Sequence, residues 1–192
     1  MVPLLFSPVI VQRRYERIPP FQAVHVLQQM AQADAQTFEV QIRSIGLTAN
    51  SPAQRVWNVW RWLPTRYVRE LNGDNWQYAA DTLAYGGDCE DWSIVLCAHL
   101  RAVGIDARMG LMPDHAAVLI PLARNQGHWQ WQPFVGFYKN PNLIPDSWPT
   151  MEYNGNLWLP LESTLSPETR GLPGQDAELI RRWARQGMLW IA

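Results

Sequence analysis

The residue best suited to chemistry in this sequence is Cys89, which lies in the run Gly-Gly-Asp-Cys-Glu-Asp at positions 86–91. The two glycines permit a tight turn, and the apolar residues from Ile94 onward have helical spacing. Asp88 is a suitable N-cap, so Cys89 is expected in the first turn of a helix. Backbone N–H groups there favour the thiolate, the nucleophilic form of cysteine. The stretch predicts a cysteine nucleophile, against the alternative of a small buried apolar residue.

A cysteine nucleophile needs a base, and four histidines are available. His99 lies ten residues along the same predicted helix, about 15 Å up its axis and out of reach. His25 lies in a helix away from other titratable groups. His115 begins the strand that follows the cysteine helix, so it is the predicted base, with His128 in reserve.

A third residue must orient the base. Glu162 ends a predicted strand that could lie beside the His115 strand, so it is the first choice. Asp114 and Asp146 are weaker candidates. A second acidic feature is the pair Asp88 and Glu90, which the N-cap position and the helix dipole explain without a metal.

These residues require helices and strands to position them. The spacing of apolar residues predicts helices over 21–45, from Ser51 to Leu63, after Asp88, and over about 175–188. Strands are predicted over 107–111, 116–122, 128–132 and 156–162. We expect an α+β fold with an extended arm over 1–20 and a single domain over 21–192. Its core is expected at about 53–165, with a loop insertion at about 123–156.

Composition limits the classes of function. A chain of 192 residues with net charge −1 suits one domain and gives no sign of nucleic-acid binding. Its two cysteines are eight residues apart on one predicted helix and make no disulfide framework. Without a signal peptide or membrane segment in the sequence, the expected location is cytoplasmic. The apolar arm and the apolar run 188–191 could each contact a protein partner.

The sequence resembles the bacterial transglutaminase-like cysteine peptidase superfamily in four features. They are the block 86–91, the helix that follows it, His115 at the start of an apolar strand, and the run 158–164 (Trp-Leu-Pro-Leu-Glu-Ser-Thr). The resemblance covers about residues 53–165 and implies a papain-like fold, with the cysteine helix packed on an antiparallel sheet. It also implies a triad of Cys89, His115 and Glu162. Two departures stand out: the acid is more often Asp, and the interval from His115 to Glu162 is long.

The activity implied is cysteine-dependent hydrolysis of an amide or peptide bond through a thioester, with a protein or peptide substrate. The Cys89 N–H is an expected oxyanion donor, and Trp76, Asp88 and Trp92 are expected around the substrate. One alternative is acyl transfer to an amine by the same triad. Others are a non-catalytic binding or assembly module, such as a phage particle component, and a redox thiol, which has no resolving cysteine nearby.

No cofactor is expected, with one exception that also comes from the resemblance. Members similar to the periplasmic adhesin-cleaving proteases hold calcium with acidic residues beside the cysteine. Asp88 and Glu90 are the corresponding positions here, and paired carboxylates suit a hard cation. Calcium at this pair is therefore the one metal that the sequence suggests.

Overall fold

A computed structural model describes residues 18–44, 47, 49–69, 75–122, 150–164 and 177–192 of the chain. Residues 1–17 of the arm expected over 1–20, the predicted strand 128–132, His128 and Asp146 lie outside this part. The described helices and strands have the following bounds: α1 Pro20–Ser44, α2 Pro52–Trp62, α3 Ala79–Tyr85, α4 Cys89–Ala102, β1 Arg108–Met112, β2 His115–Leu122, β3 Met151–Tyr153, β4 Asn156–Leu161, α5 Ala177–Arg185 and β5 Trp190–Ile191.

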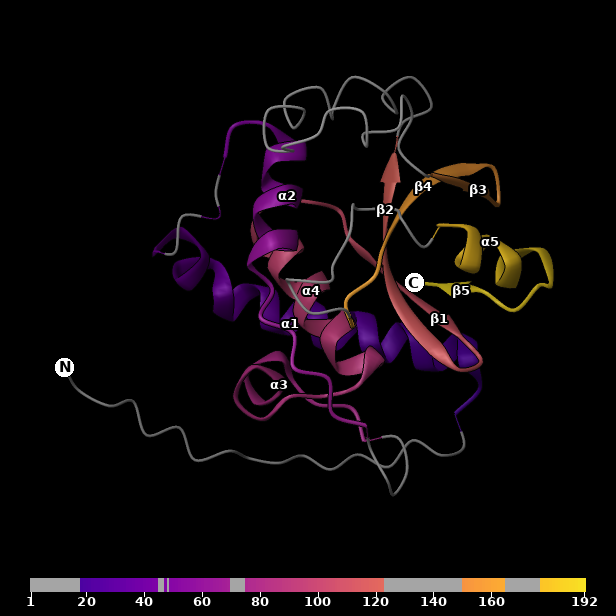
Figure 1. The fold of residues 1–192 in the computed structure, drawn as a ribbon, viewed down its shortest axis with the longest axis horizontal. Coiled ribbons are helices and arrows are strands. Elements are labelled where there is room, and N and C mark those ends of the chain that lie inside the picture. The colour runs from indigo at the N-terminus through magenta and orange to yellow at the C-terminus, as the bar shows by residue number, and fades with distance from the viewer. Residues whose placement is uncertain (1–17, 45–46, 48, 70–74, 123–149, 165–176) are drawn as a thin grey trace.

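The strands form one antiparallel sheet in the order β3-β4-β2-β1-β5. Its middle strand, β2, pairs with β1 through a tight connection and with β4 through a long one. The sheet is curled, and the hydroxyl of Tyr153, the last residue of β3, donates a hydrogen bond of 2.8 Å to the carbonyl of Leu189, just before β5. Helices α1, α2 and α4 lie on one side of the sheet and α5 on the other (Figure 1).

The core sits on both faces of the sheet, because strand side chains alternate between faces. Along β2, Val118 and Ile120 pack with the helices α1, α2 and α4. Ala117 and Leu119 pack with Ile180 of α5. Helix α4 is enclosed along nearly its whole length, with eleven buried residues from Cys89 to Leu100. The helix that carries the cysteine is thus part of the core along most of its length.

Sequence and structure agree on the fold class, which is α+β with a transglutaminase-like arrangement of helices and antiparallel sheet. The helix predicted after Asp88 is α4, which ends at Ala102, and Gly104 follows with a φ of 76°. Three elements were not predicted. Helix α3 lies in a stretch for which no helix or strand was predicted. Strand β3 lies inside the expected loop insertion, and β5 lies in the apolar run 188–191.

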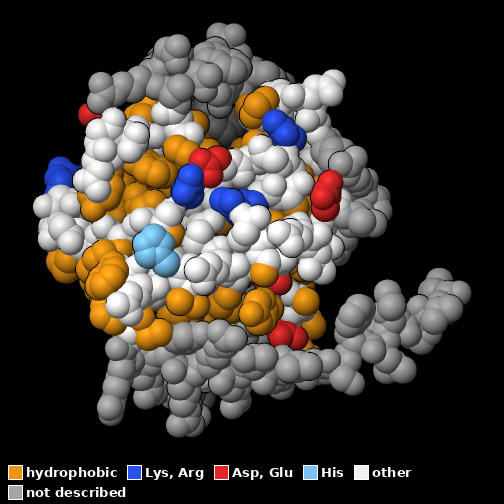
Figure 2. Space-filling model, turned by 180° about the vertical axis from the view of Figure 1, so that it is seen from behind, with side chains coloured by type: hydrophobic (Ala, Val, Ile, Leu, Met, Phe, Trp, Pro, Cys, Tyr) orange, Lys and Arg blue, Asp and Glu red, His pale blue; other side chains and the backbone are white. Residues whose placement is uncertain are grey.

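The face of the described residues seen in Figure 2 carries charges of both signs. Figure 2 shows basic and acidic side chains close together, with apolar side chains around them. None of the helices in the described ranges is long and apolar enough to cross a membrane.

Candidate active site

The glycine pair before Cys89 is required by close packing. Gly86 has a φ of 84°, a left-handed conformation that favours glycine. A Cβ on Gly86 would lie 2.7 Å from the Arg66 carbonyl oxygen, and one on Gly87 would lie 2.5 Å from the Asp91 carboxylate. Neither position has room for a side chain, because Gly86 packs against Arg66 and Gly87 packs against Asp91.

Hydrogen bonds to the Asp91 side chain connect this turn to the start of α4. Its carboxylate is fully buried and accepts hydrogen bonds from the Gln77 backbone N–H at 2.7 Å and the Gln77 side-chain amide at 2.9 Å. It also accepts from the Asp88 backbone N–H at 3.4 Å, as part of a reciprocal capping box with Asp88. Asp88 is thus the N-cap that the sequence predicts, and a buried carboxylate fixes where Cys89 begins the helix.

The Cys89 side chain is 9% exposed and faces the start of β2. Its thiol donates to the Glu90 carboxylate, with Sγ 2.9 Å from Oε2. Burial raises the pKa of the thiol, the Glu90 charge and hydrogen bond raise it further, and the Ala116 N–H directed at Sγ lowers it. The sequence predicts a thiol acidified by the helix end, whereas the structure holds it as a neutral thiol on Glu90.

His115 and Glu162 meet across β2 and β4. The register pairs Val118 with Leu161, which places Glu162 opposite Ala117 and diagonal to His115. His115 Nε2 lies 2.5 Å from Glu162 Oε2. Burial lowers the pKa of His115, but the hydrogen bond and charge of Glu162 outweigh it, so the net pKa is raised. Because Glu162 occupies Nε2, Nδ1 is the nitrogen left for proton transfer.

Residues just past β4 hold Glu162 in place, and sequence reasoning missed them. Glu162 Oε1 accepts from the Thr164 backbone N–H at 2.8 Å and the Thr164 hydroxyl at 2.6 Å. The buried Ser163 hydroxyl lies 3.0 Å from that of Ser93 on α4. These contacts tie the acid to the cysteine helix. The run Glu-Ser-Thr is the only sequence signal that could have indicated them.

A family model described as the transglutaminase-like superfamily matches residues 41–162. The match covers more than half of the chain and includes Cys89, His115 and Glu162. The chain belongs to the transglutaminase-like superfamily. This superfamily includes cysteine hydrolases and acyltransferases. No curated protein and no solved structure matches the chain.

The residues predicted around the substrate, Trp76, Asp88 and Trp92, lie close to this transglutaminase-like site and differ in their contacts. Trp76 is buried next to Gln77, which binds Asp91. Trp92 is 1% exposed, and its indole N–H donates to the Arg66 carbonyl at 3.0 Å. This hydrogen bond joins Trp92 of α4 to the segment around Arg66. Contact of either tryptophan with a substrate stays a prediction. Burial, with the charges of Glu90 and Asp91, raises the pKa of Asp88 to about 8.

The predicted calcium ligands lie together beside the nucleophile. Ligand atoms of Asp88, Cys89 and Glu90 are within 4.8 Å of one another. Calcium takes six to eight oxygen ligands, and this group offers two carboxylates and a thiol. The described part of the chain therefore supplies an incomplete calcium site, and calcium binding stays a prediction.

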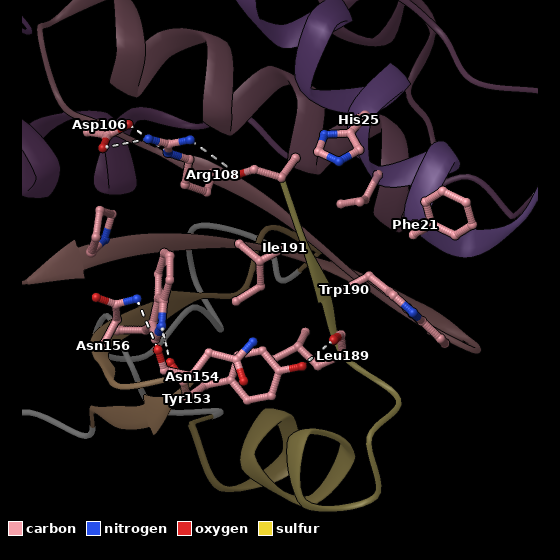
Figure 3. Close-up of a pocket in the computed structure, with 14 residues that line it drawn as sticks. Phe21, His25, Asp106, Arg108, Tyr153, Asn154, Asn156, Leu189, Trp190 and Ile191 are labelled. Atoms are coloured by element: carbon pink, nitrogen blue, oxygen red, sulfur yellow. Dashed lines mark hydrogen bonds and ion pairs between the residues drawn. The ribbon is translucent and has the colours of Figure 1, made fainter.

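A separate cavity has a volume of about 580 Å³. Its walls include Phe21, Arg108, Tyr153 and Trp190, and Figure 3 shows the Arg108–Asp106 and Tyr153–Leu189 contacts within it. Pro121 also lines it, six residues along β2 from His115, or about 20 Å at strand spacing. Cys89, His115 and Glu162 do not line this cavity, so it is distinct from the candidate active site.

Proposed function

We propose that this chain is a cysteine-dependent amide or peptide hydrolase that acts through a thioester. The observation that carries the proposal is the His115–Glu162 pair of 2.5 Å at the start of β2, where the Ala116 N–H points at Cys89 Sγ. A nucleophile, a base and an orienting acid on three separate elements are the groups that this chemistry needs. Membership of the transglutaminase-like superfamily adds support.

In the first half of the reaction, the Cys89 proton moves to His115 Nδ1 and Sγ attacks the substrate carbonyl carbon. The carbonyl oxygen takes the negative charge, which the Cys89 backbone N–H at the α4 N-terminus is positioned to stabilise. The C–N bond then breaks, and the proton on His115 passes to the leaving amine. The products are a free amine and a Cys89 thioester.

In the second half, His115 takes a proton from a water molecule while the water oxygen attacks the thioester carbonyl carbon. The C–S bond breaks, the acid product leaves, and the Cys89 sulfur regains its proton. Throughout, Glu162 keeps the His115 ring in the tautomer that carries a proton on Nε2. The two bonds from Thr164 prevent the carboxylate from turning away.

Replacing Cys89 and His115 tests the proposal. We expect Cys89→Ala to fold and to abolish hydrolysis of a peptide panel, and His115→Ala to reduce it at least a hundredfold. Acyl adducts on Cys89, seen by intact mass spectrometry, would report the thioester. Cys97→Ala is the matched control, because Cys97 is buried in the same helix with its pKa raised by burial to about 12. A Cys89→Ala protein as active as wild type would rule the proposal out.

A further inference from the structure

Exposed apolar side chains gather beside the nucleophile turn. The described residues include five large apolar side chains with substantial exposure: Phe21, Tyr67, Val68, Tyr85 and Leu179. Of these, Tyr67 (51% exposed), Val68 (44%) and Tyr85 (55%) flank the Gly86–Gly87 turn. We call these three residues the apolar ledge. Surface clusters of this kind on an otherwise mixed surface mark binding sites.

Backbone contacts fix the ledge to the turn. Tyr67 forms a parallel bridge with Gly87, and the Val68 N–H donates to the Gly87 carbonyl at 2.8 Å. Val68 Cγ2 lies 2.7 Å from where a Gly86 Cβ would stand. The Arg66 guanidinium donates to the Tyr85 carbonyl, which joins the two sides. The backbone of the ledge is therefore already ordered, so a bound group would not pay the entropic cost of ordering it.

The ledge also lies within reach of the reacting sulfur. The bridge between Tyr67 and Gly87 places the ledge beside the residues that lead into α4, and burial raises the pKa of the Tyr67 phenol. Gly87, which Tyr67 bridges, precedes Cys89 by two residues, or about 7 Å of extended chain. A group held on the ledge thus lies one or two peptide residues from a carbonyl at Cys89.

We propose that the apolar ledge binds an apolar, preferably aromatic, side chain of the substrate within two residues of the scissile carbonyl. The inference rests on the proposed function and adds a substrate class to it. Tyr67 and Tyr85 offer large contact areas with few rotatable bonds, so they suit an aromatic or branched apolar group. A polypeptide bearing only small or charged side chains at these positions binds more weakly.

The test uses two probes that alkylate cysteine through the same reactive group. Iodoacetamide is small, and its N-(2-phenylethyl) derivative carries an aromatic ring at about the reach of the ledge. We expect the aromatic probe to alkylate Cys89 on the order of tenfold faster in wild-type protein. Tyr67→Ala/Tyr85→Ala should bring the ratio of rates close to one, whereas Tyr67→Phe/Tyr85→Phe should preserve it.

The controls separate this inference from the proposed function. Leu179→Ala removes an apolar side chain of similar exposure on α5 and should leave the ratio unchanged. The alanine variants should fold, because the contacts that fix the ledge use the backbone of Tyr67 and Tyr85. Equal reactivity of wild-type Cys89 toward both probes would overturn the inference alone. A Cys89 inert toward both would overturn the proposed function and the inference with it.

Discussion

The Cys89 thiol is subject to opposing influences from its nearest neighbours. The α4 N-terminus and the Ala116 N–H stabilise a thiolate, whereas burial and the Glu90 carboxylate stabilise the thiol. Glu90 Oε2, at 2.9 Å from Sγ, accepts the hydrogen bond that keeps the proton on sulfur. These contacts favour the protonated form of Cys89, and under the proposed mechanism the sulfur becomes nucleophilic when its proton passes to His115.

Glu90→Gln is expected to lower the pKa of Cys89, because it removes the negative charge beside the sulfur and keeps the side-chain size. We expect the midpoint of the pH profile for Cys89 alkylation to fall by about one unit. Peptide mass spectrometry after pulse alkylation measures it, with Cys97 as the internal reference. Glu152→Gln, at an exposed position on β3, should leave the profile unchanged. An unaltered midpoint in Glu90→Gln would show that burial alone sets the pKa.

At the residue scale, the sequence indicated which side chains meet but not how they are held. Cys89 could be predicted because a turn, a cap and a helix start are local patterns. His115 and Glu162 could be predicted as strand ends, although their roles remain proposals. The Glu90 contact with sulfur, and the Ser163–Ser93 contact, depend on side-chain orientation, which no spacing in the sequence encodes.

The turn between α3 and α4 positions Cys89, and the absence of a side chain at Gly87 allows the Asp91 carboxylate to lie against this turn. Gly87→Ala would push its Cβ into the Asp91 carboxylate and disturb the bonds to Gln77 and Asp88. We expect a loss of about 1–3 kcal/mol in the free energy of unfolding and a changed rate of Cys89 alkylation. Chemical denaturation and the alkylation assay measure the two effects.

Gly155→Ala is the control for this prediction. Gly155 has a φ of 74°, but no atom lies within 4 Å of its missing Cβ. Alanine there should cost about 1 kcal/mol through backbone strain alone and leave Cys89 alkylation as in wild type. If both variants alter the alkylation rate equally, the packing of Gly87 on Asp91 does not govern the position of Cys89.

At the element scale, long periodic segments were predictable and short ones were not. The expected helix over 21–45 corresponds to α1 Pro20–Ser44, and the strand over 116–122 to β2 His115–Leu122. Helix α3 has seven residues, and Asp34 of α1 accepts a hydrogen bond from its first N–H at 2.8 Å. Strands β3 and β5 have three and two residues. Such elements exist because of distant partners, so local patterns cannot reveal them.

At the scale of the whole molecule, a buried histidine makes stability depend on pH. His99 is fully buried on α4, stacked on Phe38 with ring centroids 4.6 Å apart, and Nδ1 lies 2.8 Å from the Val95 carbonyl. Burial lowers its pKa to about 4, although the Val95 hydrogen bond opposes this. The folded protein therefore keeps His99 neutral under conditions in which the unfolded chain protonates it.

Acidification should consequently destabilise the fold through His99. The pKa of a histidine in the unfolded chain is about 6.5. The stability contributed by neutral His99 is therefore fully present above that pH and is lost as the pH falls toward 4. Between pH 7 and pH 5 we expect a loss of about 2 kcal/mol from this group. Asp34, with its pKa raised by burial to about 6, acts in the opposite sense. The comparison must therefore be made between wild type and a variant.

His99→Phe keeps an aromatic ring in the stack and removes the titrating group. Urea denaturation at pH 7 and pH 5 should show a smaller acid-induced loss in this variant than in wild type, by about 2 kcal/mol. His25→Phe, at an exposed position on α1, is the matched control and should behave as wild type. Identical pH dependence in all three proteins would mean that His99 does not set the acid limit of the fold.

His115 and Glu162 are separated by 47 residues, whereas α4, β1 and β2 follow one another closely. During synthesis the chain emerges N-terminus first, and contacts between near neighbours in sequence close at a lower entropic cost than distant ones. A nascent chain that ends before β4 therefore has Cys89 on its helix and His115 on its strand, but no carboxylate to orient the imidazole. The order of translation thus delays the contact between His115 and Glu162 until β4 has paired with β2.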